Sequence, residues 1–217
     1  FYIGINVGAF ISSLVVGYVG EVYGWHYGFG LAGIGMGLGL LQYVLGLKYL
    51  SQVGNYLGDS KTDQEVMKAP LTKVEKDRVG VLLISFLLVI LFWGAFEQAG
   101  GLMNIYTMEN TDRFLGDWQV PASWFQSINA MFIIFFGTSV ALFWANRKLK
   151  GQWLSKLSYP LSLPVSTSLY KMIVGLIIMG VGFFFMTGAT AQYEATGSSA
   201  MYWLVFAYLF HTIGELC

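Results

Sequence analysis

Charged side chains are scarce in this chain. They make up 11% of its 217 residues, whereas soluble proteins carry about 25%. The 12 basic residues balance the 12 acidic ones, so no net charge favours binding to nucleic acid. A single cysteine, Cys217, excludes a disulfide within the chain. The composition therefore argues against both a soluble domain and a nucleic-acid-binding protein.

Motifs for covalent chemistry are also missing. The sequence has no phosphate-binding loop, nucleophile elbow or nucleotide-binding glycine pattern. No spacing of cysteine, histidine or paired carboxylates predicts a bound metal. We therefore expect a protein that is not an enzyme, has no cofactor and is not driven by ATP. Because no signal peptide is visible and both chain ends, Phe1 and Cys217, fall inside apolar segments, we expect a piece of a longer protein.

Apolar residues, by contrast, form long runs. They account for 56% of the chain, with 7 Trp, 13 Tyr and 17 Phe, a composition typical of membrane proteins with aromatic belts. A helix needs about 20 apolar residues to cross a bilayer. Six such segments predict an all-α integral membrane protein: 1–23, 26–49, 79–106, 123–145, 168–187 and 201–217. The polar stretch 51–78 separates the second from the third, and its last part, 71–78, is typical of a capped helix start.

The basic residues predict how the segments are oriented. Six flank or lie in the loop after the second segment, and five flank the loop after the fourth. These are Lys48, Lys61, Lys68, Lys73, Lys76 and Arg78, and then Arg147, Lys148, Lys150, Lys156 and Lys171. Only Arg113 falls on the other side. Because cytoplasmic loops carry an excess of lysine and arginine, both basic loops are expected in the cytoplasm.

Glu97 is a lone carboxylate that directly follows the apolar run 79–96. A charged carboxylate inside a membrane helix costs about 2.5–3.5 kcal/mol, so such a residue is by default functional. Glu215 repeats the pattern near the end of the last segment. Two intramembrane carboxylates predict a proton- or ion-coupled carrier.

Five short motifs follow one another along the chain. They are FYIGINVGAF at 1–10, GWHYGFG at 24–30, FWGAFEQAG at 92–100, WFQSIN at 124–129 and TIGEL at 212–216. With these motifs the chain resembles the proton-coupled oligopeptide transporters, a branch of the major facilitator superfamily. The resemblance implies that the six segments are helices 5 to 10 of a twelve-helix core. Ala130 departs from the family pattern, which often has proline after the asparagine, and this change is expected to stiffen the helix.

The resemblance also implies a division into domains. Residues 1–50 would be the last two helices of the N-terminal six-helix bundle, and residues 79–217 the first four helices of the C-terminal bundle. The stretch 51–78 would be the cytoplasmic linker, too short to hold the two extra helices of many bacterial members. Helices 1 to 4 and 11 to 12 would lie in the missing remainder of the same chain.

Site residues follow from the chemistry of a peptide and from the resemblance. Glu215 is predicted to bind the peptide amino terminus, and Asn6 and Asn129 to bind the peptide backbone through their amides. The alternative for either asparagine is a hydrogen bond between helices. Trp93 is predicted to line the pocket. Tyr2 and Gln126 are weaker site candidates, and His211, one turn before Glu215, is a weaker candidate for tuning it.

Glu97 is the predicted proton-coupling residue. Such a group alternates between a protonated form and a form paired with a cation. The resemblance supplies basic partners from the missing first bundle, so that protonation would release a gate. The alternatives are a structural ion pair and a permanently neutral carboxylate.

These features predict a symporter in the plasma membrane that imports di- and tripeptides with protons by alternating access. Its partners would be peptides, the lipid bilayer and the rest of its own chain. One alternative is the same fold carrying nitrate or a peptide-like metabolite. Another is a membrane sensor or scaffold that does not transport, in which Glu97 and Glu215 would be vestigial.

Overall fold

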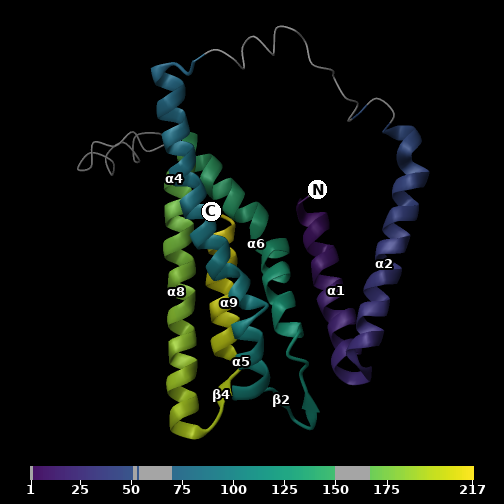
Figure 1. Cartoon of the computed structure of the whole chain (residues 1–217). Helices are drawn as coiled ribbons and strands as arrows, with labels where there is room; N and C mark the ends of the chain where they lie inside the picture. Colours follow the sequence, from purple (N-terminus) through teal and green to yellow (C-terminus); the bar gives the residue numbers. More distant parts are fainter. Residues whose placement is uncertain (1, 51–52, 54–69, 150–166) are drawn as a thin grey trace.

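A computed structural model describes residues 2–50, 53, 70–149 and 167–217. The described part is built almost entirely of helices that run between two ends of the molecule (Figure 1). The helices are α1 (Tyr2–Tyr23), α2 (Trp25–Gly46) with η1 (Leu47–Tyr49), α4 (Lys73–Phe96) with η2 (Glu97–Ala99), α5 (Leu102–Asn110), α6 (Trp124–Leu149), α8 (Thr167–Thr196) and α9 (Tyr202–Glu215). The all-α prediction is confirmed.

Four two-residue strands lie at one end of the helices. They are β1 (Thr111–Asp112), β2 (Phe114–Leu115), β3 (Trp118–Gln119) and β4 (Ser199–Ala200). Strand β1 pairs in parallel with β4, and β2 forms an antiparallel hairpin with β3. The β1–β4 pairing ties the connection after α5 to the connection between α8 and α9.

Five of the six predicted spans appear as helical stretches long and apolar enough to cross a membrane. They cover Tyr2–Tyr23, Trp25–Tyr49, Lys73–Asn110, Trp124–Asn146 and Ser168–Thr196. The sixth segment forms α9, which has 14 residues. The third segment differs from an unbroken helix, because α4 ends at Phe96 and α5 starts only at Leu102. Gly100 and Gly101 lie in this interruption, where their low helix propensity favours a break.

The start of α4 shows the capped geometry predicted for 71–78. The Glu75 backbone N–H donates to Thr72 Oγ1 at 3.4 Å, and the Thr72 backbone N–H donates to Glu75 Oε2 at 2.7 Å. This reciprocal pair is a capping box, which satisfies two N–H groups at a helix start. The rest of the predicted linker, apart from residues 53 and 70–72, lies outside the described residues.

The two ends of the molecule carry different connections (Figure 1). The C-terminal end of α2, the start of α4, the end of α6 and the start of α8 lie at one end, the predicted cytoplasmic end. The α1–α2 turn, α5 and the four strands lie at the opposite end, which we call the outer end. Arg113, between β1 and β2, is therefore at the outer end, as the charge pattern predicts.

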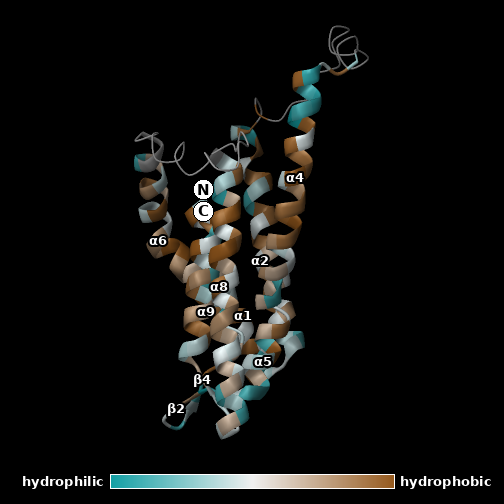
Figure 2. Cartoon of the chain, turned by 90° about the vertical axis from the view of Figure 1, so that its left-hand side faces the viewer, coloured by the Kyte–Doolittle hydropathy of each residue, from teal (hydrophilic) through white to brown (hydrophobic). Residues whose placement is uncertain are grey.

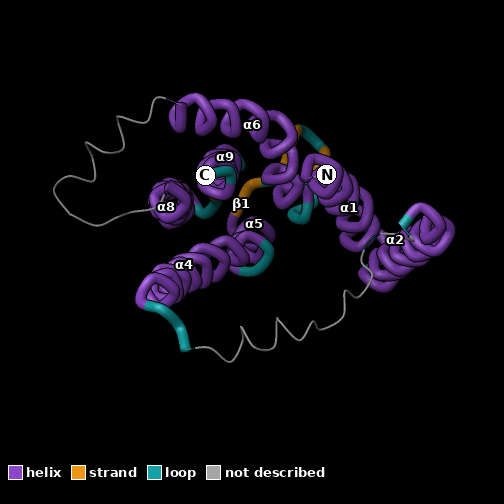
Figure 3. Tube along the Cα trace, turned by 90° about the horizontal axis from the view of Figure 1, so that it is seen from above, coloured by secondary structure: helices purple, strands orange, loops and turns teal. Residues whose placement is uncertain are grey.

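The helices pack in a defined order, seen from above in Figure 3. Helix α9 lies between α6 and α8, α4 contacts α8, and α1 contacts both α6 and α2. A buried cluster that includes Met103, Phe125, Leu204 and Tyr208 holds α5, α6 and α9 together. Figure 2 shows apolar residues along α2 and α4, with hydrophilic residues at the start of α4. Their apolar surfaces are exposed, as expected for helices that face lipid or other transmembrane helices.

Candidate functional site

Three predicted site residues from three helices meet at one point. Tyr2 of α1 donates its hydroxyl hydrogen to Glu215 Oε1 at 2.8 Å. Asn129 of α6 donates through Nδ2 to Glu215 Oε2 at 3.1 Å and to Thr212 Oγ1 at 3.0 Å. Each oxygen of the Glu215 carboxylate thus accepts a hydrogen bond from a different helix. We call Tyr2, Asn129, Thr212 and Glu215 the carboxylate cluster.

Helix α9 positions two members of the carboxylate cluster. Glu215 is its last residue, and Thr212 lies three residues earlier, so both side chains share one face. Thr212 is fully buried, and its hydroxyl donates to the Tyr208 carbonyl oxygen at 2.7 Å. That bond orients the Thr212 oxygen to accept from Asn129. Thr212 is therefore fixed in the buried part of the cluster, whereas the Glu215 side chain is only half-buried.

A cavity of about 180 Å³ opens beside Glu215. Trp93 of α4 lines it together with Glu215, so the structure brings these two predicted residues to one space. The remaining lining residues are mostly apolar: Leu88, Val89, Phe92, Met172, Gly214 and Cys217. One carboxylate among apolar walls is typical of a site that fixes a charged group and accepts variable apolar groups.

Glu97 lies apart from the carboxylate cluster, at the interruption between α4 and α5. It is the C-terminal capping residue of α4 and the first residue of η2. Its side chain is exposed and, within the part of the chain that the structure describes, makes no ion pair or hydrogen bond. The Tyr208 hydroxyl donates to the Ala99 carbonyl oxygen at 3.3 Å and so ties the interruption to α9. Glu97 is held in place by its backbone, while its carboxylate is unbonded.

The other three predicted residues do not join the cluster. Asn6 is buried, and its Nδ2 donates to the Tyr2 carbonyl oxygen at 3.0 Å, within its own helix. Gln126 lines a separate cavity of about 290 Å³ between α1, α2, α5 and α6. His211 is buried against Phe183 of α8, with ring centroids 4.7 Å apart. Neither nitrogen of its ring has a hydrogen-bond partner among the described residues.

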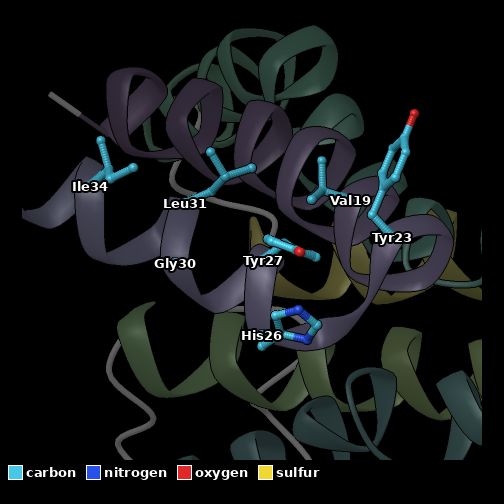
Figure 4. Close-up of a pocket in the computed structure, with 7 residues that line it drawn as sticks. All are labelled: Val19, Tyr23, His26, Tyr27, Gly30, Leu31 and Ile34. Carbon is cyan, nitrogen blue, oxygen red and sulfur yellow. The ribbon is translucent and has the colours of Figure 1, made fainter.

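The most spacious of these hollows contains no predicted site residue. It has a volume of about 550 Å³ and lies between α1 and α2 near their connection (Figure 4). Its lining residues are Val19, Tyr23, His26, Tyr27, Gly30, Leu31 and Ile34. In Figure 4 the Tyr23 hydroxyl points away from the His26 ring, so the two polar groups do not converge on one ligand position.

Sequence reasoning missed three residues that the structure makes prominent. Thr212 was part of a motif but was not a site candidate, although it accepts a hydrogen bond from Asn129. Glu21 and Arg113 were counted only as outer loop charges, yet Arg113 Nη1 lies 3.9 Å from Glu21 Oε2. The sequence contained one indication that Arg113 is special, since it is the single basic residue predicted at the outer end.

Comparisons with known proteins agree on one family. A family model described as "PTR2: POT family" matches residues 1–65 and 60–217. The peptide transporter YePEPT of Yersinia enterocolitica is 28% identical over 280 residues, covering 100% of this chain and 52% of that protein. A di-/tripeptide transporter of Lactococcus lactis is 23% identical over 274 residues, with coverage of 100% and 52%.

Solved structures give the same result. The crystal structure of a peptide transporter POT in complex with sulfate superposes with a TM-score of 0.70 and 26% identity, covering 100% of this chain and 52% of that one. A POT family transporter in complex with 5-aminolevulinic acid superposes with a TM-score of 0.64 at 23% identity, with coverage of 100% and 53%, and shows the shared fold. The chain spans about half the length of the curated relatives it matches.

Proposed function

Because the chain belongs to the POT family, we propose that the full-length protein imports di- and tripeptides together with protons by alternating access. The chain is an all-α, multi-pass membrane protein with the major facilitator fold. Its family and its structural neighbours point to a transporter rather than to an enzyme. The observation that carries the proposal is the carboxylate cluster, in which Glu215 is bonded from both α1 and α6.

The carboxylate cluster suits the amino terminus of a peptide. An ammonium group at Glu215 forms a charge-assisted hydrogen bond and replaces the neutral donors Tyr2 and Asn129. Asn129, once released, has an amide that both donates to and accepts from a peptide bond. The apolar cavity beside Trp93 leaves room for variable side chains. Constant peptide groups are thus bound by polar contacts, and variable ones by apolar walls.

Glu97 is the group we assign to proton coupling. Its carboxylate, which has no partner among the described residues, is available either to a proton or to a cationic side chain from the rest of the full-length protein. Residues 1–50 and 79–217 would belong to the two bundles, joined by a cytoplasmic linker. Protonation of Glu97 would break an ion pair between the bundles and allow them to move.

Uptake into proteoliposomes that contain the full-length protein tests this function. A labelled dipeptide should accumulate with an inward proton gradient and should not accumulate without one. In Glu97→Gln the gradient-driven accumulation should be lost, while exchange of peptide for peptide should continue. Unlabelled tripeptide should compete and nitrate should not. Absence of dipeptide uptake or competition under every gradient would reject the peptide assignment and leave the fold unaffected.

A further inference from the structure

The outer ends of α1 and α6 make a close contact. The Trp124 Nε1–H donates to the Leu14 carbonyl oxygen at 3.0 Å. Gly17 lies one helical turn nearer the outer end than Leu14 and faces Ser123. Glu21 lies one turn beyond Gly17 and faces the residues that lead into α6. We call Leu14, Gly17 and Glu21 of α1, together with residues 122–124, the outer seam.

Glu21 binds the N-terminal end of α6 in the outer seam. Its two carboxylate oxygens accept hydrogen bonds from the backbone N–H groups of Ala122, at 2.9 Å, and Ser123, at 2.7 Å. Ala122 and Ser123 come directly before the first residue of α6, and the partial positive charge at a helix start makes a carboxylate favourable there. These bonds join residues more than 100 positions apart in the sequence.

Arg113 adds a positive charge on the α6 side of the outer seam. Its guanidinium is buried, with Nη1 3.9 Å from Glu21 Oε2. The same nitrogen donates to the Val120 carbonyl oxygen at 2.6 Å, which attaches Arg113 to the segment that leads into α6. Arg113 and two backbone N–H groups thus face Glu21, which is the charged side chain that α1 contributes to the outer seam.

Gly17 allows the two helices to approach. A Cβ atom on Gly17 would lie 2.6 Å from the Ser123 Cβ atom, which is too close for two carbon atoms. Beside this contact lies the cavity of about 290 Å³, and Gly17 and Ser123 line it together with Ser12, Ser13, Asn104 and Gln126, among others. Because Gly17 and Ser123 belong to the outer seam and also line this cavity, separation of the seam would open the cavity toward the outer end.

We propose that Glu21 is a gate residue that closes the outer end of the transport pathway. The proposal rests on the proposed function, because it requires α1 and α6 to belong to bundles that move apart. When the seam separates, Glu21 exchanges two backbone N–H donors and Arg113 for water. The strength of its bonds then sets the fraction of molecules that is open to the outside.

The test measures access from outside to the cavity of about 290 Å³ beside the outer seam. Ser13→Cys, in the full-length protein freed of its other cysteines, is a reporter that lines this cavity. Its rate of modification by a membrane-impermeant maleimide should rise about tenfold in Glu21→Gln, because hydrogen bonds to a charged group are lost from the closed state only. Glu109→Gln is the matched control, since Glu109 is an exposed carboxylate of α5 that makes no hydrogen bond or ion pair within the described chain.

A second pair of variants tests the seam without changing charge. Gly17→Ala should raise the modification rate because its methyl group overlaps Ser123. Adding Ser123→Gly, which removes the overlapping atoms, should return the rate to that of the parent. If both Glu21→Gln and Gly17→Ala leave the rate within twofold of the parent, the gate assignment is wrong.

The same measurements distinguish failure of the gate assignment from failure of the transport assignment. Modification needs no peptide, so a raised rate in Glu21→Gln supports the gate even if the parent fails to take up dipeptide. Normal dipeptide uptake with unchanged modification rates would overturn the gate and keep the function.

Discussion

Glu97 and Glu215 are both rare carboxylates within apolar helices, yet the structure gives them opposite surroundings. Glu215 accepts one hydrogen bond on each oxygen, from Tyr2 and Asn129. Glu97 accepts none within the described chain and lies where α4 is interrupted. The two residues have the same chemistry but differ in how many donors the fold places around them. That difference, rather than the residue type, is the basis on which we propose a binding role for Glu215 and a coupling role for Glu97.

The difference has a physical basis in where each residue lies on its helix. Glu215 lies on α9, which packs against α6, and the side chains of Asn129 from α6 and Tyr2 from α1 reach its carboxylate. Glu97 follows the last residue of α4, a helix in which no residue is buried. A bonded carboxylate exchanges its donors only for a stronger partner, such as an ammonium group. An unbonded one can take up a proton without breaking a contact inside this chain.

The largest expected effect comes from removing the charge of Glu97. An inward gradient of two pH units can concentrate a solute about 100-fold for each coupled proton. In Glu97→Gln this accumulation should fall to a ratio of about 1 in proteoliposomes, because the side chain can no longer gain and lose a proton. Exchange of labelled for unlabelled dipeptide should stay near the parent rate. Retained accumulation would show that coupling resides elsewhere.

Glu215→Gln should give the second largest effect. The KM for a dipeptide should rise about 10- to 100-fold, because a hydrogen bond to a charged group contributes about 1.5–3 kcal/mol. A dipeptide with an acetylated amino terminus should bind the parent weakly and lose nothing further in the variant. Glu194→Gln, an exposed carboxylate at the end of α8, is the control and should leave both values unchanged. An equal loss for both ligands in Glu215→Gln would place the amino terminus elsewhere.

Much of the fold, and the importance of these two carboxylates, could be predicted from the sequence. Segment lengths give the spans, the order of Thr72 and Glu75 gives the helix cap, and the scarcity of charge singles out both carboxylates. The interruption after Phe96 was less visible, because a glycine pair inside an apolar run is compatible with a continuous helix. The contact between Glu21 and Ser123 was not predictable, since it depends on how two distant helices pack. Local patterns therefore identify which residues are unusual, and tertiary packing decides what each one contacts.

The two predicted asparagines, Asn129 and Asn6, differ in what their side-chain amides contact. Asn129 bonds across helices to Glu215, whereas Asn6 bonds a carbonyl of its own helix. Asn129→Leu should raise the KM for dipeptide about tenfold, because the amide that we assign to the peptide backbone is lost. Asn6→Leu is the matched substitution and should change the KM less than threefold. A larger effect in Asn6→Leu would mean that Asn6 turns toward the substrate during transport.

Tyr2→Phe should have the smallest effect, since it removes one neutral donor and keeps the ring. The KM for dipeptide should fall about 2- to 5-fold, because the ammonium group no longer has to displace this bond from Glu215, and a single hydrogen bond contributes ~0.5–1 kcal/mol. In the Glu215→Gln background the same change should do nothing, because the bond at 2.8 Å needs the carboxylate. This double-mutant cycle, measured by competition of unlabelled dipeptide, isolates the contact between α1 and α9. Additive effects would show that Tyr2 acts on the substrate independently of Glu215, and the carboxylate cluster would then not work as one unit.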